Sequence, residues 1–341
     1  MRLWMCLLVV FVSGPSYGRG LEKFWNHQLV TGCTVLDFND TILAQLPGKF
    51  CAFFDDGSFV SASDTHLRFI TKDNEVKWEI PGHFHHQLNL SIDKTKILAL
   101  GSRIFPVKSN GSFRSDRLMV VDLAGKILHE ADSEEVLKTT GIRWLAWEMT
   151  QAFREITGAG IEMSHFNSFY EIPKNPNPAF KAGGYIVNGH SQGSFIFSPD
   201  LQSVTLAPPL RIAFLNNSHD VQVTERGNLL LFVNKHRDGR HENPFSTVNE
   251  VDPRTQKSVF EFSATPKELF YSEYCGGVQE LDGDHVLISD QLTGTFVYAT
   301  KRKKILSAVR KTHKLNNTPG QAQQVKLFDL GKFLTSRGIK F

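Results

Sequence analysis

Short apolar runs recur along the chain in groups of four, and turns rich in Gly, Asp and Pro separate them. The clearest group begins at His219, with runs at 219–224, 229–234, 246–252 and 257–264. Runs of this kind, rich in β-branched and aromatic residues, predict β-strands. Similar groups begin near Phe50, His85, His165 and Gly276. The pattern therefore predicts five repeated four-stranded units.

A sixth unit begins at Ala322, but the chain ends after two predicted strands, 322–328 and 332–337. Two further strand-like runs, 34–38 and 41–47, are available near the start of the chain. Combining them closes a ring and leaves no exposed sheet edge. We therefore predict an all-β, six-bladed β-propeller whose last blade is closed by N-terminal strands.

The largest insertion lies between Glu130 and Ile161 and has a different period. Ser133, followed by two glutamates, resembles a helix start, and residues 137–156 carry apolar and aromatic side chains at helical spacing. This pattern predicts a helical insertion over about 131–160. Its aromatic residues are expected to pack the helix on the propeller, with a wall of a substrate pocket as the alternative.

The N-terminal residues 1–18 have the features of a signal peptide. Arg2 precedes an apolar run, Leu3–Val12, and Ser16 and Gly18 are small residues suited to cleavage. The run is shorter than the roughly 20 residues of a membrane-spanning helix, and no later segment is long and apolar enough. We expect residues 19–341 to form the exported domain, periplasmic or secreted, with no membrane span.

Charge and cysteine content add two expectations. The net charge of +3 is too small to indicate nucleic-acid binding. Cys33 and Cys51 could form a disulfide in an oxidising compartment, and Cys275 is then left as a small buried hydrophobic residue rather than a catalytic thiol.

Histidine marks the first strands of three predicted blades. In a propeller these strands line the central channel, so His86, His165 and His219 are expected to converge on its axis. Strand alternation places Asn167 on the same face as His165. The histidines come from separate blades without short metal-ligand spacing, so we expect neither a metal nor a cofactor. Imidazole and amide groups suit a sulfuryl or phosphoryl group, which one neutral imidazole can attack.

These strands resemble one known enzyme family. The stretches HDVQVTERGNLLLFVNKHRDGR from His219, HFNS from His165 and HHQLNL from His85 are similar to those of the aryl-sulfate sulfotransferases. The resemblance covers about residues 50–298. It implies a six-bladed propeller that transfers a sulfuryl group from an aryl sulfate ester to a phenolic or other hydroxyl acceptor through a sulfohistidine.

The resemblance also implies a role for each residue. His219 would be the nucleophile, and His86, His165 and Asn167 would bind the sulfate oxygens and assist the leaving phenolate. The family carries an arginine in the strand after the HFNS motif, where this chain has Asn188, Gly189 and His190. His190 and Arg103 are the candidate replacements for sulfate binding.

We therefore expect a sulfotransferase-like enzyme whose partners are a small aryl sulfate donor and a hydroxyl acceptor. A non-catalytic propeller that binds a glycan, peptide or protein is the alternative, because propellers have many unrelated functions. A metal-dependent lyase or hydrolase is a third possibility.

Overall fold

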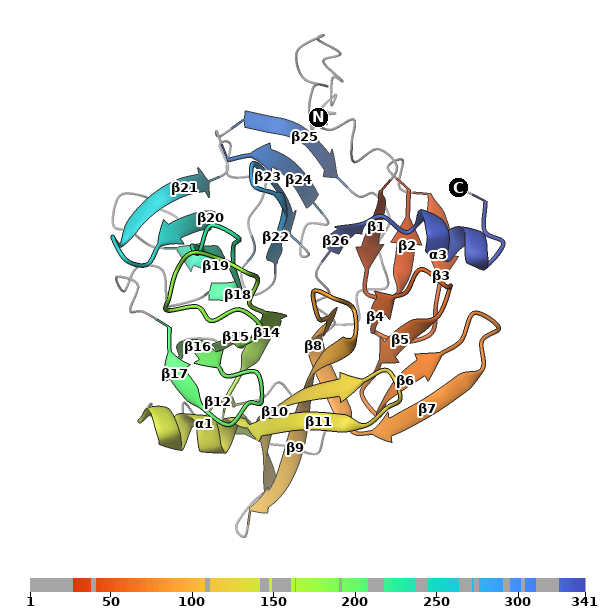
Figure 1. Ribbon diagram of the computed structural model, residues 1–341, viewed down its shortest axis with the longest axis horizontal. Coiled ribbons are helices and arrows are strands. Elements are labelled where there is room, and N and C mark those ends of the chain that lie inside the picture. Colours follow the sequence, from red (N-terminus) through yellow and green to blue (C-terminus); the bar gives the residue numbers. More distant parts are fainter. Residues whose placement is uncertain are drawn as a thin grey trace, which may run out of the picture.

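The computed structural model describes residues 27–37, 41–107, 111–141, 147–148, 161–162, 164–189, 192–207, 218–236, 245–263, 272, 276–290, 295–301, 304–310 and 325–340. Their strands form six antiparallel blades around a central axis (Figure 1). The six-bladed all-β prediction is confirmed.

The first three blades follow one another along the chain. Blade I contains β4 (Phe50–Phe53), β5 (Phe59–Ala62), β6 (His66–Ile70) and β7 (Val76–Pro81). Blade II contains β8 (His83–Leu90), β9 (Lys96–Val107), β10 (Gly111–Asp122) and β11 (Ile127–Asp132). Blade III contains β14 (Phe166–Glu171), β15 (Tyr185–Gly189), β16 (Gly193–Phe197) and β17 (Val204–Leu206).

The other three blades complete the ring. Blade IV contains β18 (Ser218–Val223), β19 (Leu229–His236), β20 (Phe245–Asp252) and β21 (Lys257–Ser263). Blade V contains β22 (Gly277–Asp282), β23 (His285–Asp290), β24 (Thr295–Thr300) and β25 (Lys304–Arg310). Blade VI contains β26 (Val325–Phe328), β1 (Gln28–Thr31), β2 (Thr34–Leu36) and β3 (Ile42–Gln45).

Blade VI is closed by N-terminal strands, as predicted, but its division differs from the expected two and two. The C-terminus supplies only β26, which pairs with β1, and the N-terminus supplies three strands. Residues 332–337, predicted to be a strand, fall mainly in helix α3 (Gly331–Ser336). Phe333 and Leu334 of this helix are both buried and pack in the hydrophobic cluster between blades VI and I.

The insertion after blade II is only partly helical. Helix α1 spans Ser133–Thr140, and Gly141 ends it in the left-handed conformation (φ 68°). The predicted helix over 137–156 is wrong at β12 (Trp147–Glu148), which pairs with β13 (Ile161–Glu162). Strand β13 in turn pairs in parallel with β10. The remaining residues of the insertion lie outside the described residues, and so do Trp144, Phe153 and the predicted signal peptide.

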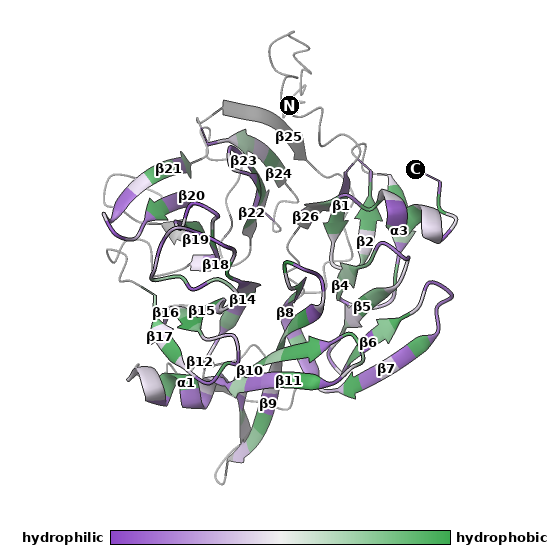
Figure 2. Cartoon of the chain, viewed as in Figure 1, coloured by the Kyte–Doolittle hydropathy of each residue, from purple (hydrophilic) through white to green (hydrophobic). Residues whose placement is uncertain are grey.

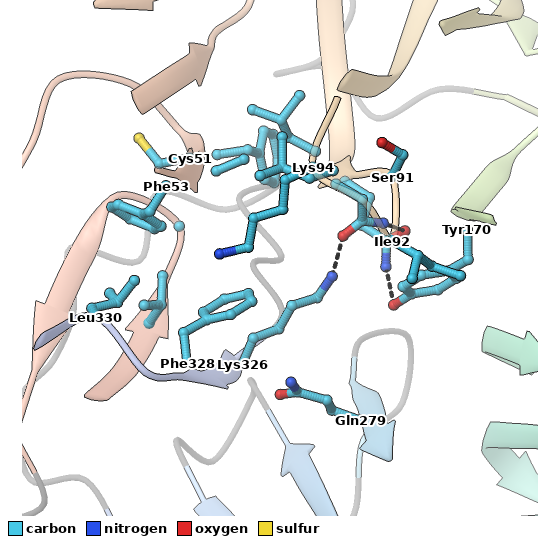
Figure 3. Close-up of a pocket in the computed structure, with 18 of the residues that line it drawn as sticks. Cys51, Phe53, Ser91, Ile92, Lys94, Tyr170, Gln279, Lys326, Phe328 and Leu330 are labelled. Carbon is cyan, nitrogen blue, oxygen red and sulfur yellow. Dashed lines mark hydrogen bonds between the residues drawn. The ribbon is translucent and has the colours of Figure 1, made fainter. Parts of the chain in front are cut away.

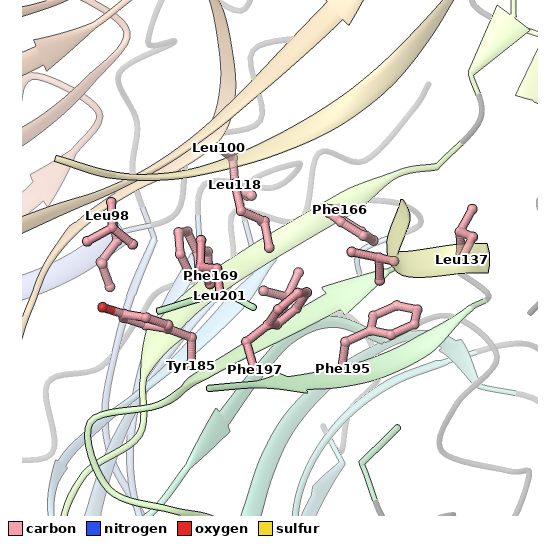
Figure 4. Packing of buried hydrophobic residues seen from close by; sticks show 13 residues of the cluster. Leu98, Leu100, Leu118, Leu137, Phe166, Phe169, Tyr185, Phe195, Phe197 and Leu201 are labelled. Carbon is pink, nitrogen blue, oxygen red and sulfur yellow. The ribbon is translucent and has the colours of Figure 1, made fainter. Parts of the chain in front are cut away.

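Each junction between neighbouring blades has its own hydrophobic cluster. The cluster between blades II and III contains Phe166 and Phe169 of β14 packed against Leu98 and Leu118 (Figure 4). The outer strand β7 is largely exposed and hydrophilic, whereas the strands inside it are buried (Figure 2). Packing between successive blades therefore holds the ring together.

A repeated hydrogen bond also connects the innermost strands. The side chains of Gln87, Ser168 and Asp220 each accept a hydrogen bond from a backbone N–H of the next blade. The three donors are the N–H groups of Phe169, Val221 and Val278, at 2.9, 3.3 and 3.0 Å. These bonds fix how far each inner strand lies along the axis relative to its neighbour.

Cys33 and Cys51, which the sequence left open as a possible pair, form a disulfide. Cys33 lies in the turn between β1 and β2, and Cys51 lies in β4, so the bond joins blade VI to blade I. It acts at the junction that also brings together the two ends of the chain. No helix of the described residues is long and apolar enough to cross a membrane.

Candidate functional site in the central channel

Three innermost strands are irregular at equivalent places. The pairing register shifts between Phe84 and Leu88 in β8, between Phe166 and Ser168 in β14, and between Ser218 and Asp220 in β18. The extra residues form β-bulges, which change the direction of nearby side chains and are frequent beside active sites. His86, Asn167 and His219 lie at these bulges, each one residue before an acceptor of the inter-blade hydrogen bonds.

We refer to His86, Asn167 and His219 as the first ring. The bulge at Asn167 corrects one expectation from the sequence. Simple alternation between His165 and Asn167 does not hold across a bulge. The three histidines also do not share one repeat position, because Asn167 is the blade III equivalent of His86 and His219, and His165 precedes it by two residues.

The histidine rings nevertheless converge, as predicted. The ring centroid of His86 lies 4.6 Å from that of His165 and 6.1 Å from that of His219. His86 has φ 59°, a left-handed conformation that is rare for a residue with a side chain. Such strain is typical of functional sites, where the surrounding structure imposes it.

His219 is held in a defined tautomer. Its Nδ1 lies 2.8 Å from the carbonyl oxygen of Gly276, and a carbonyl can only accept, so Nδ1 carries the proton. In the neutral ring Nε2 therefore carries the lone pair. Gly276 has φ 127°, and a Cβ there would clash with the ring of Phe232. Glycine is thus required at the position that orients the His219 imidazole.

His165 is oriented by a buried ionic group. Its Nδ1 lies 2.7 Å from Oε2 of Glu162, and Glu162 also pairs with the guanidinium of Arg114. The Arg114 guanidinium lies 3.4 Å from Oδ1 of Asp116 as well. Arg114 is only 1% exposed and Asp116 is fully buried. One cation and two carboxylates therefore lie directly behind the histidine rings.

Asp116 fixes the start of β14. Its Oδ2 accepts hydrogen bonds from the N–H of Phe166 at 2.7 Å and from the hydroxyl of Ser164 at 3.0 Å. Its Oδ1 lies 3.0 Å from Nε2 of His85. Burial acts to raise the pKa of Asp116, but Arg114 and His85 hold it at about 2. The carboxylate is therefore charged at neutral pH and positions both His85 and the segment carrying His165.

Burial keeps the channel histidines neutral. Burial, reinforced by the charge of Arg114, lowers the pKa of His165 to about 4. Burial and the neighbouring histidines lower the pKa of His86 well below its ordinary value. At neutral pH these rings can therefore donate or accept hydrogen bonds without carrying a charge.

Asn167 is the clearest sign that a ligand belongs in the channel. Its side chain is 1% exposed, and neither Oδ1 nor Nδ2 has a hydrogen-bond partner among the described residues. An unsatisfied buried carboxamide costs free energy, and native proteins keep such groups where a ligand or water completes them.

Neither candidate replacement for the family arginine, His190 or Arg103, is seen at the histidine rings among the described residues. His190 lies outside the described residues. Arg103 does not reach the rings: its side chain is 40% exposed, and it pairs with Asp132 at 2.7 Å and Glu130 at 3.0 Å. Arg114, which was not predicted from the sequence, supplies a buried guanidinium from the same blade. The signal was present in the charged residues of the FRSDR stretch, within an otherwise strand-like run.

Among the described residues, no group of three or more His, Cys, Asp or Glu side chains is arranged to hold a metal ion. The arrangement supplies two oriented imidazole lone pairs, on Nε2 of His219 and of His165, together with the neutral His86 ring and a buried amide. Such groups can attack and hold an electrophilic centre with several oxygens.

No protein-family model matches the sequence, and no curated protein matches it. Among solved structures, a protein of unknown function from Bacteroides caccae aligns with a TM-score of 0.53 and 12% identity, over 89% of this chain and 98% of that one. A virginiamycin B lyase from Staphylococcus aureus aligns with a TM-score of 0.43 and 10% identity, over 82% and 78% of the two chains. The first likeness supports the propeller fold alone.

Proposed function

We propose that the channel transfers a sulfuryl group from an aryl sulfate ester to a phenolic or other hydroxyl acceptor, with His219 as the nucleophile. The observation that carries this proposal is the hydrogen bond from Nδ1 of His219 to Gly276, which leaves the lone pair on Nε2 beside His86. The resemblance of the first strands to aryl-sulfate sulfotransferases supports the same assignment.

The reaction proceeds in two balanced steps. Nε2 of His219 attacks sulfur, a nitrogen–sulfur bond forms, the ester oxygen–sulfur bond breaks, and the phenolate leaves with the bonding pair. The acceptor oxygen then attacks the same sulfur, the nitrogen–sulfur bond breaks with its electron pair returning to Nε2 of His219, and the acceptor proton passes to water. A covalent intermediate divides one difficult transfer into two easier ones.

The other channel groups assist by hydrogen bonding. Asn167 offers an amide N–H to a sulfate oxygen, and the neutral ring of His86 offers a further N–H group. Glu162 holds the His165 ring through Nδ1, and the developing negative charge on the leaving oxygen is stabilised by donors already in place.

The test uses 4-nitrophenyl sulfate as donor and phenol as acceptor, with release of 4-nitrophenolate as the readout. Phenol should accelerate release by the wild type, and His219→Ala should abolish it. His66→Ala is the matched control, since His66 lies in β6 and bonds to Thr65. A folded wild type that releases nothing from a panel of aryl sulfates would overturn the proposal.

A non-catalytic binding protein is the second candidate, and the charge of the site favours it. Two carboxylates, Glu162 and Asp116, offset the guanidinium of Arg114. Such a site suits a neutral ligand better than a sulfate. Binding of a neutral glycan or peptide that survives His219→Ala, without turnover of any aryl sulfate, would favour this role.

We further propose that the protein works outside the cytoplasm. The support is the predicted signal peptide together with the Cys33–Cys51 disulfide, because disulfides persist in oxidising compartments. Recovery of the protein, cleaved after about residue 18, in the exported fraction of the host would test this.

A further inference from the structure

A second ring of side chains lies farther along the channel. Each of its members follows a first-ring residue, or Gly276 at the equivalent position of blade V, by three residues: these members are Asn89, Tyr170, Gln222 and Gln279. Asn89 and Gln222 make the same inter-blade bond, donating to the carbonyls of Phe169 and Val278. Three residues of β-strand correspond to about 10 Å, so this second ring lies about 10 Å from the first.

Lys326 of β26 completes the second ring. It lies in the part of blade VI that corresponds to Gln279, where Val325–Lys326 matches Val278–Gln279. Its ammonium donates a hydrogen bond to Oδ1 of Asn89 and lies 4.9 Å from the centre of the Tyr170 ring (Figure 3). A cation is thus placed inside the channel among neutral amides and an aromatic ring.

A cavity of about 460 Å³ surrounds this ring. All five members of the second ring line it, and so does His86 of the first ring. Its remaining walls are largely apolar; Phe53 and Leu330 lie on one side of Lys326 and Tyr170 lies on the other (Figure 3). Volumes of about 300 to 1,000 Å³ with apolar walls and a few placed polar groups are typical of small-molecule sites.

The carboxylates that line the cavity are already engaged. Asp55 pairs with Lys94 and Lys332, both largely exposed, at 3.2 and 3.3 Å. Glu280 pairs with Lys301 at 2.5 Å. Asp329 is exposed and accepts a hydrogen bond from the N–H of Gly331. None of the ion pairs found among the described residues involves Lys326.

Burial lowers the pKa of Lys326 to about 8, and the nearby Asp220 opposes this shift. The ammonium is therefore charged at neutral pH but poorly compensated. A partly buried charge of this kind is stabilised when a ligand of opposite charge binds beside it.

We propose that this cavity binds a small aromatic carboxylate, with the carboxylate paired to Lys326 and the ring packed among Phe53, Phe328 and Tyr170. One cation selects one negative charge. Because the cavity reaches His86, a hydroxyl at the far end of such a molecule would approach the first ring. Its use as the sulfuryl acceptor, unlike its binding, rests on the proposed function.

Isothermal titration calorimetry with 2-naphthoate and its neutral analogue 2-naphthamide tests the binding. At pH 7 the wild type should bind the carboxylate at least about tenfold more tightly, since removing one member of a buried charge pair is costly. Lys326→Met should abolish the preference and Lys326→Arg should keep it. Lys94→Met is the control, because Lys94 lines the mouth but pairs with Asp55, and it should leave the preference unchanged.

The pH dependence separates Lys326 from other cations. The wild-type preference should disappear as the pH rises from 7 to 10, whereas Lys326→Arg should retain it, because arginine stays charged. The Lys326→Met protein should fold at least as stably as the wild type, since it buries no charge. Equal affinity for the two probes in the wild type, an unchanged preference in Lys326→Met, or no binding of either probe would overturn the proposal.

The same titration on His219→Ala distinguishes this proposal from the proposed function. Binding of 2-naphthoate should be unchanged in that variant whether or not the wild type transfers sulfuryl groups. Binding of 2-naphthoate by a wild type that transfers no sulfuryl group would contradict the transferase alone, and loss of the carboxylate preference in Lys326→Met but not in His219→Ala would support the cavity.

Discussion

Replacing Asp116 by Asn should destabilise the protein while preserving the shape of the side chain. Oδ2 must still accept from Phe166 and Ser164, so the new NH₂ group takes the position of Oδ1, 3.0 Å from Nε2 of His85. Nε2 also lies 3.1 Å from the carbonyl of Gly101 and is therefore a donor. The substitution places two donors face to face and removes one of the carboxylates beside Arg114.

The magnitude follows from the pKa of Asp116. Its value of about 2, against an ordinary 3.8, corresponds to about 2.5 kcal/mol in favour of the charged form, at about 1.4 kcal/mol per pH unit. Because the folded pKa lies below the unfolded one, this stabilisation is fully present above about pH 4 and is lost as the pH falls towards 2. We expect Asp116→Asn to lower the free energy of unfolding by about 2 to 4 kcal/mol at pH 7.

Urea unfolding at pH 7 and 25 °C, followed by tryptophan fluorescence, measures this change. Asp284→Asn is the matched control, since Asp284 is 60% exposed and lies 3.4 Å from Arg226. The control should change stability by less than about 0.5 kcal/mol. If Asp116→Asn behaves like Asp284→Asn, the buried carboxylate does not anchor the site and the reasoning is refuted.

Three further predictions concern the channel and the ring closure. Asn167→Leu should leave the midpoint of thermal unfolding unchanged or raise it, because it removes an unsatisfied buried amide. The same variant should have no turnover. A large loss of stability would show that the amide is satisfied within the protein. The pKa values of His83 and His165 in the folded protein are about 3 and 4, so on acidification the unfolded chain binds these protons first; lowering the pH from 7 to 5 should therefore reduce the free energy of unfolding by about 2 kcal/mol for each residue. Urea unfolding at both pH values should show a smaller reduction in His165→Gln than in the wild type. An equal reduction would contradict the pKa assigned to His165. Replacing both Cys33 and Cys51 by Ser should lower the free energy of unfolding by about 3 kcal/mol relative to the oxidised wild type, because the disulfide closes a loop of 18 residues in the unfolded chain. An unchanged stability would show that the bond does not constrain the unfolded chain.

The blades could be predicted from the sequence because the patterns that indicate their strands and turns are local. Apolar runs, turn residues and the repeat of four strands locate blades I to V, and the excess of strands at one end predicts ring closure. The division of blade VI was wrong because the short run at Gln28–Thr31 carries little pattern of its own. Its strand forms because it pairs with β26, nearly 300 residues away in the chain.

Only part of the candidate site could be predicted from the sequence. The three histidines were found, since each lies in or directly before an inner strand that could be predicted from the sequence. The bulges that aim His86, Asn167 and His219 depend on pairing register, which no local pattern specifies. Arg114, Asp116 and Glu162 were missed for the same kind of reason. They reach the histidines through the long β10 and its parallel pairing with β13, a contact made only in the folded chain.

The most direct test of the central claim is mass spectrometry of the protein after rapid mixing with 4-nitrophenyl sulfate, without an acceptor, followed by quenching in base. The account predicts an acid-labile, base-stable sulfuryl group on the peptide containing His219. The label should disappear when phenol is added and should be absent from His219→Ala. Turnover of the ester without any label on His219, or a label that persists in His219→Ala, would contradict it.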